Sequence, residues 1–266
     1  MNKGGMDIST IGGIGLGFGA ILIGYLLEGG NPAGLVGPSA IIIIAGGTIG
    51  ALMTSFTIKD VMSIPKLIGQ ATQLSKGPTS DLVETIITFA EKARREGILS
   101  LEGDIDDIGN PLLKKGVKLL VDGTDPEIVR NILENDIYIF ELRRKEEAAI
   151  FDTAGGYSPT MGIIGTVTGL VLVLSRLGGD AAELGHSIAV AFIATLYGIG
   201  LANLFWLPVG GKLKLKMKLE KLEKEMIVVA VLSLMQGENP SVMRDKLDPF
   251  LEEGHKEKKG GGGEEK

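Results

Sequence analysis

Two threonines in uncharged, apolar stretches are the residues whose chemistry stands out in this sequence. Thr166 lies in the stretch 158–177, which has no charged residue from Pro159 to Ser175, and Thr195 lies in the next apolar stretch. A hydroxyl in hydrocarbon is costly unless it faces a partner helix or water. We therefore expect the two stretches to line an ion path. For each threonine taken singly, a hydrogen bond to the carbonyl four residues earlier is the competing interpretation.

Two prolines and a phenylalanine accompany these hydroxyls. Pro159 lies at the start of the first stretch and Pro208 at the end of the second. A proline within a helix frees a carbonyl and creates a hinge, although each proline taken alone is more readily explained as a helix end. Phe192 precedes Thr195 by three residues and shares its helical face. It either lines the path or packs as an ordinary apolar residue.

Charged groups are missing where an ion carrier usually needs them. No Asp, Glu, Lys, Arg or His lies in the middle of any apolar stretch, whereas a proton pump usually has an ionisable group there. Either the protein moves no ions, or a partner helix brings the carboxylate. The sequence also has no cysteine, no metal-ligand spacing, no nucleophile motif and no basic patch interleaved with aromatic residues. These features argue against an enzyme, a bound cofactor and a nucleic-acid partner.

Four apolar segments of about 20 residues predict an all-α membrane protein with four transmembrane helices. The expected spans are 8–27, 35–54, 158–177 and 187–207. The mean hydropathy of +0.27 and the 40 glycines agree with this class. Small residues four apart in the first span would let a neighbouring helix approach closely.

A charged block, 58–150, separates the second span from the third. Capping residues predict that three helices begin in it at Asp81, at Asn110-Pro111 and at Asp125-Pro126. The last of these helices is expected to run to about Thr153. Gly155-Gly156 is then expected to bend the chain before the third span.

The segment after the fourth span is interpreted as a helix, although 212–219 alternates as a strand would. Leu222, Met226 and Val229 continue at helical spacing, and a last short helix begins at Asn239-Pro240. The predicted organisation is spans one and two in 1–57, a cytoplasmic helical domain in 58–150, spans three and four in 151–211, cytoplasmic helices in 212–254 and a disordered tail in 255–266.

The distribution of positive charge predicts the topology. Lysines and arginines gather in 58–150 and 209–266, whereas the turns 28–34 and 178–186 have none. By the positive-inside rule both termini and the large block are cytoplasmic, and the short turns face outside. The lysines of 212–218 are expected to extend toward anionic membrane lipid.

Three charged residues surround a glycine in the predicted cytoplasmic block. Arg94, Arg95 and Glu102 lie on either side of Gly97. Taken alone, they are more readily explained as a solvated helix end and loop. The functional interpretation is an electrostatic docking surface, because exposed charges set the orientation of an encounter.

Several motifs together resemble the MotA/PomA family of flagellar stator subunits, within the wider MotA/TolQ/ExbB superfamily. They are the sequence Tyr-Ser-Pro-Thr-Met-Gly-Ile-Ile-Gly-Thr at 157–166, Ala-Thr-Leu-Tyr-Gly-Ile-Gly-Leu-Ala-Asn at 194–203, Leu-Pro at 207–208 and Ala-Arg-Arg-Glu-Gly-Ile-Leu-Ser-Leu-Glu at 93–102. The resemblance covers about residues 6–250. TolQ and ExbB proteins have three spans, so the extra first span favours the flagellar branch over an ExbB/TolQ-like energy-transducing subunit.

The resemblance implies a motor component of the bacterial inner membrane. Five copies would surround two copies of a single-span, peptidoglycan-binding MotB/PomB-type partner, whose membrane aspartate carries H⁺ or Na⁺. Ion passage would rotate the pentamer, and the cytoplasmic ring would drive the rotor through FliG.

The resemblance also implies roles for individual residues. Pro159 and Pro208 match the two family prolines, Thr195 the threonine facing the ion site and Phe192 the bulky residue near it. Arg94 and Glu102 match the charged rotor contacts, with Arg95 beside them. Thr166 occupies a place where sodium-type members tend to have a hydroxyl and proton-type members alanine, which leaves the ion open.

Overall fold

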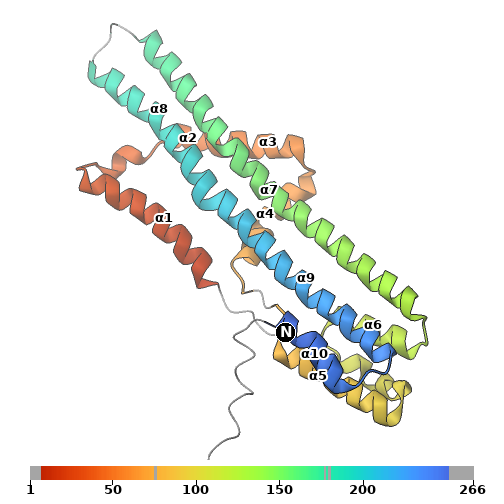
Figure 1. The fold of residues 1–266 in the computed structure, drawn as a ribbon. Helices are drawn as coiled ribbons and strands as arrows, with labels where there is room; N and C mark the ends of the chain where they lie inside the picture. The colour runs from red at the N-terminus through yellow and green to blue at the C-terminus, as the bar shows by residue number, and fades with distance from the viewer. Residues whose placement is uncertain (1–6, 75–76, 177, 179–180, 252–266) are drawn as a thin grey trace, which may run out of the picture. The chain divides into compact units, whose positions relative to one another are not determined.

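The computed structural model describes residues 7–74, 77–176, 178 and 181–251, and its regular elements in these ranges are helices. Figure 1 shows the helices along the chain. The chain divides into two compact units. The first unit comprises 1–74 with 144–215, and the second comprises 75–143 with 216–266. Two long helices, α7 (Pro126–Ser175) and α9 (Leu207–Met235), contribute residues to both units.

The first unit contains the apolar helices. In chain order its further elements are α1 (Ile8–Leu27), η1 (Pro32–Leu35), α2 (Pro38–Ile41), η2 (Ile42–Gly46), α3 (Gly47–Ser55), α4 (Ile58–Ala71), α8 (Ala181–Leu201) and η4 (Ala202–Trp206). Four helical segments of the described chain are long and apolar enough to cross a membrane: Ile8–Leu27, Pro32–Ser55, and parts of Pro126–Ser175 and Ser187–Met235. The prediction of four spans is confirmed.

The second unit packs short amphipathic helices around one apolar core. Its further elements are α5 (Ser80–Glu96), η3 (Ile98–Asp107), α6 (Pro111–Val121), α10 (Pro240–Leu247) and η5 (Asp248–Phe250). Val83 and Ile86 of α5, Leu113 of α6 and Met226 of α9 are buried in this core. The starts at Asn110-Pro111, Asp125-Pro126 and Asn239-Pro240 are confirmed, because a helix begins at the proline of each pair.

The expected bend at Gly155-Gly156 is wrong, and so is the helix end at Thr153, because α7 continues through them to Ser175. The reason is packing: a methyl group at Gly155 would lie 2.5 Å from Cδ2 of Leu207, so this glycine admits a neighbouring side chain.

Two further starts differ from the predictions. α5 is capped by Thr79, whose Oγ1 accepts a hydrogen bond from the backbone N–H of Leu82 at 3.3 Å, and not by Asp81. α8 begins at Ala181, six residues before the expected span, because helical geometry extends beyond the most apolar residues.

Asp7 fixes the beginning of α1. Its carboxylate accepts a hydrogen bond from the N–H of Ser9 at 3.1 Å and pairs with Nζ of Lys212 at 2.5 Å, and its own N–H donates to the carbonyl of Thr72 at 2.7 Å. The hydrogen bond from Lys212 holds the pKa of Asp7 well below its usual value. One residue thus joins the start of α1 to the end of α4 and to α9.

Candidate ion path and charged docking surface

A seam of small residues brings α7 and α8 into contact. A methyl group at Gly198 would lie 2.7 Å from the carbonyl oxygen of Ser158, and one at Gly162 would lie 2.9 Å from that of Ala194. Gly165 is equally close, since its methyl group would meet Cβ of Ala194 at 2.7 Å. Membrane helices pack most closely where such residues face each other. The two helices run side by side in Figure 1.

The seam places the two predicted hydroxyls against each other. Oγ1 of Thr166 forms a short hydrogen bond with Oγ1 of Thr195, and either atom can be the donor. Oγ1 of Thr166 also lies 3.1 Å from the carbonyl of Gly162 and 2.9 Å from that of Ala191. A hydroxyl has one proton, so Thr166 donates to one of these acceptors at a time. Bonding to the carbonyl four residues earlier is therefore real for Thr166, but it coexists with the contact across the helices.

A buried serine, eight residues before Thr166, forms a further hydrogen bond across the same seam. Oγ of Ser158 donates to the carbonyl of Gly198 at 2.9 Å, and Ser158 is fully buried. Sequence reasoning missed Ser158 and its glycine partners. The spacing of Gly162, Gly165 and Gly169 is the signal that could have found the seam, because residues three and four apart share one helical face.

Both predicted prolines lie inside helices. Pro159 is within α7, and Pro208 is the second residue of α9, directly after the π-helical η4. Because α8, η4 and α9 follow one another without a break and form one helix over Ser187–Met235, Pro208 does not mark a helix end. The interpretation that each proline marks a helix end is therefore wrong. A wider turn before Pro208 relieves the clash that its ring would make with a preceding carbonyl. Phe192 lies on α8 one turn from Thr195 with 61% of its surface exposed, so in this chain it is not a packed core residue.

The three predicted docking charges are gathered at the end of α5. Arg94 and Arg95 lie in the last turn of α5, and Glu102 lies in η3; all three are exposed and form no ion pair among the described residues. Gly97 joins the two elements with φ of 88° and ψ of 159°, a conformation essentially restricted to glycine.

η3 is held firmly against α5. Leu101 is fully buried, and Nζ of Lys92 pairs with Asp104 at 2.6 Å. The charged residues therefore project from a supported turn.

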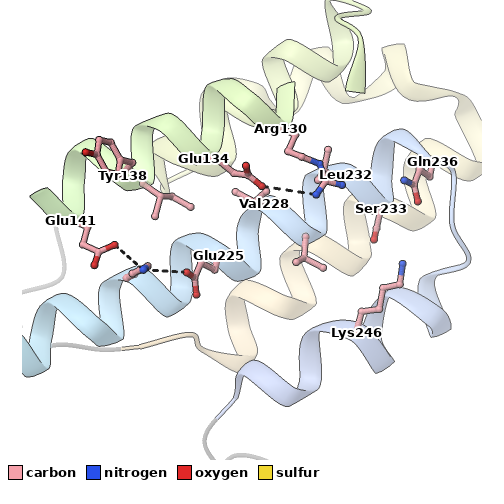
Figure 2. Close-up of a pocket in the computed structure, with 13 residues that line it drawn as sticks. Arg130, Glu134, Tyr138, Glu141, Glu225, Val228, Leu232, Ser233, Gln236 and Lys246 are labelled. Carbon is pink, nitrogen blue, oxygen red and sulfur yellow. Dashed lines mark ion pairs between the residues drawn. The ribbon is translucent and has the colours of Figure 1, made fainter. Parts of the chain in front are cut away.

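A groove of about 530 Å³ in the second unit was not predicted. Figure 2 shows Glu134 and Glu141 of α7 across from Glu225 and Leu232 of α9. Nζ of Lys221 lies 2.7 Å from Glu141 and 3.7 Å from Glu225, and Glu141 raises the pKa of Lys221. Charges of both signs line the groove, so their electrostatic fields largely cancel within it.

The described residues contain no group of three His, Asp or Glu side chains that could hold a metal ion. Apolar spans, a small-residue seam and uncharged hydroxyls together define a multi-pass helical membrane protein whose polar groups meet between spans. Two family models match the chain: motility protein A, N-terminal, over residues 11–97, and the MotA/TolQ/ExbB proton channel family over residues 104–226.

Relatives and solved structures match this chain over nearly its whole length. Motility protein A of Bacillus subtilis is 38% identical over 92% of this chain and 91% of that protein, and chemotaxis protein PomA of Vibrio alginolyticus is 35% identical over 94% and 97%. The structure of C. jejuni MotAB matches with a TM-score of 0.88 and 33% identity, covering 93% of this chain and 97% of that one. The flagellar MotAB stator complex of Bacillus subtilis matches with a TM-score of 0.86 and 37% identity, covering 93% and 98%. The chain belongs to the MotA/TolQ/ExbB proton channel family.

Proposed function

We propose that Thr166 and Thr195 form the part of an ion path that this chain contributes as a stator subunit of the flagellar motor. The observation that carries the proposal is their hydrogen-bonded contact in spans that have no Asp, Glu, Lys, Arg or His in the middle. Such hydroxyls orient an ion or a proton but do not titrate, so the carboxylate comes from a MotB/PomB-type single-span partner. The role is mechanical and not enzymatic.

Phe192, Pro159 and Pro208 complete the proposed path. The exposed ring of Phe192 lies on the Thr195 face of α8 and is available to the partner helix. Each proline interrupts the hydrogen-bond ladder of a helix that continues beyond it. These two sites are therefore the proposed flexing points of the path during ion passage.

The conducted ion is H⁺ or Na⁺, with no further cofactor. Hydroxyl and carbonyl oxygens around Thr166 suit a hard cation, and a hydroxyl pair also suits proton transfer. Swimming speed measured against sodium concentration, with and without a protonophore, separates the two ions.

Valine substitutions test the hydroxyl pair. Thr195→Val and Thr166→Val keep the side-chain shape but remove the contact, so we expect each to abolish or strongly reduce motility at normal protein levels. The matched control is Thr168→Val, since among the described residues the hydroxyl of Thr168 bonds carbonyls of its own helix alone, those of Ile164 and Gly165, both at 3.0 Å. Normal swimming in both test variants would refute the proposal.

The proposed rotor contact uses Arg94, Arg95 and Glu102 against charges on FliG. Their exposure and their freedom from ion pairs among the described residues support this role. Reversal of one charge, in Arg94→Glu, should lower torque and be rescued by an opposite change on FliG. Arg143→Glu is the control, because Arg143 is an exposed arginine of α7 away from this turn. Full torque in Arg94→Glu would contradict the docking role.

Assembly and location follow the same proposal. Five copies surround two partner subunits that bind peptidoglycan, in the bacterial inner membrane with both termini cytoplasmic. The solved complexes of similar chains with MotB support the partner and an oligomer. An ExbB/TolQ-like energy-transducing subunit is not favoured, because the matched relatives are motility proteins aligned over almost their full length.

A further inference from the structure

An apolar hollow of about 500 Å³ lies between α1 and α8 in the first unit. Phe18, Ile21 and Leu22 form the α1 wall, and Leu196, Tyr197 and Gly200 belong to the α8 wall. The hollow lies outside the contact of α7 with α8, and its interpretation is independent of the ion path.

Contacts at its two ends keep the hollow open. At one end α1 touches η4, since a methyl group at Gly17 would lie 2.8 Å from Cδ2 of Leu204. Further along, a methyl group at Gly200 would meet one atom, Cε1 of Phe18 at 4.0 Å, so the lining leaves room beside this position. At the other end the hydroxyl of Tyr197 donates to the carbonyl of Leu35. The one hydroxyl of the lining is therefore occupied, and no lining side chain is left to bind a polar ligand.

We propose that this hollow binds one acyl chain of a membrane lipid. Both walls belong to membrane-spanning helices, where lipid tails are the surrounding solvent. Water does not fill an apolar cavity, and an empty one would forfeit the dispersion contacts of its lining. An acyl chain restores these contacts and needs no polar partner.

The residue types favour a lipid over the helix of a second copy. Close helix contacts in membranes use small residues, as the seam between α7 and α8 does, whereas large aliphatic and aromatic side chains dominate this hollow.

Photolabelling of the intact complex tests the proposal. The full-length protein, purified with its partner subunit, is placed in vesicles of phosphatidylethanolamine or phosphatidylglycerol that carry a diazirine in the middle of one acyl chain. We expect labelled peptides to contain residues 18–22 and 196–201, with equal labelling from both headgroups. Gly200→Leu should lower this labelling several-fold because the new side chain fills the hollow.

The control is Gly12→Leu, which is not three, four or seven residues from Phe18, Ile21 or Leu22 along α1 and where a side chain meets nothing within 4 Å. It should label as the unchanged protein does. If Gly200→Leu does not fold, Ile21→Trp fills the same hollow from the α1 wall. Unchanged labelling in the filling variants would overturn the proposal. So would absent labelling together with crosslinking of one copy to another through a photoreactive side chain in Ile21→benzoylphenylalanine, because a second copy would then occupy the hollow.

Discussion

The contact between Thr166 and Thr195 exists only because α7 and α8 approach at glycine. Gly198→Ala would place a methyl group 2.7 Å from a backbone oxygen of α7, and backbone cannot move aside as a flexible side chain can. We expect the helices to separate and motility to be lost, at an overpacking cost of about 1–3 kcal/mol.

The native sequence has no cysteine, so paired cysteines at 166 and 195 report the separation directly. Their disulfide should form readily in the otherwise unchanged chain and poorly with Gly198→Ala. Gly185→Ala, at an open position of α8, should leave both disulfide formation and the protein level unchanged. Equal crosslinking in all three backgrounds would contradict the prediction.

Glu223 of α9 gives a pH-dependent prediction. Burial raises its pKa, against a 2.7 Å hydrogen bond from Nδ2 of Asn110 that lowers it. Because the folded-state pKa lies above the unfolded value, the folded state binds the proton more tightly, and stability falls as the pH rises through this range. Glu223→Gln keeps an acceptor for Asn110, so its Tm should exceed that of the unchanged protein at pH 7. The gain should vanish near pH 4; an equal gain at every pH would be inconsistent with this origin.

At the level of elements, the sequence predicts helices well where length and capping chemistry agree. Residues 8–27 are long and uncharged, and Asn110-Pro111 is a strong helix start, so both predictions are confirmed. The prediction at Gly155-Gly156 is wrong because glycine occurs both at bends and where helices pack closely. Which of the two applies depends on the residue that packs against it. Leu207 is that neighbour, 52 positions later, and no local pattern reveals it.

The lack of information about neighbouring helices also limits what the sequence predicts of the candidate site. The uncharged setting of Thr166 and Thr195 indicates a polar contact between spans. Their carbonyl partners and the role of Ser158 depend on the register of α7 against α8, which residue spacing along one helix does not determine. The two π-helical segments, η2 and η4, likewise have no local signature in the sequence.

The turn between α5 and η3 gives a prediction at this scale. Gly97→Ala would force a side chain into a backbone conformation with φ of 88° and ψ of 159°, at a cost of about 1–3 kcal/mol. We expect a lower Tm and reduced torque, since Arg94 and Glu102 lie on either side of this turn. Gly103→Ala, in η3 with open space and no positive φ, should do neither. Unchanged torque in Gly97→Ala would show that the geometry of the turn is unimportant.

For the whole molecule, charge placement predicts dependence on a partner. No Asp, Glu, Lys, Arg or His lies in the middle of any span, so vesicles with this chain alone should show no ion flux above empty vesicles. Flux should appear when a MotB/PomB-type partner is present and disappear again when the partner's membrane aspartate is replaced by asparagine. Flux through the chain alone would make it a transporter in its own right.

The wide turn of η4 makes this helix tolerant of a change in its length. A π-helical turn holds one residue more than the α-helical turn it replaces, so deletion of one residue within Ala202–Trp206 would restore a regular helix. The wide turn already absorbs this residue, so the deletion would leave the residues after it at nearly their present rotation about the helix axis. Lys212 would still face Asp7, and α1 would keep its ionic tie to α9. A deletion between Leu207 and Lys212 would instead rotate Lys212 by about 100°, since each α-helical residue advances by that angle, and would break the tie. Only a gap of the second kind in the alignment of a relative therefore signals a different arrangement of its first span.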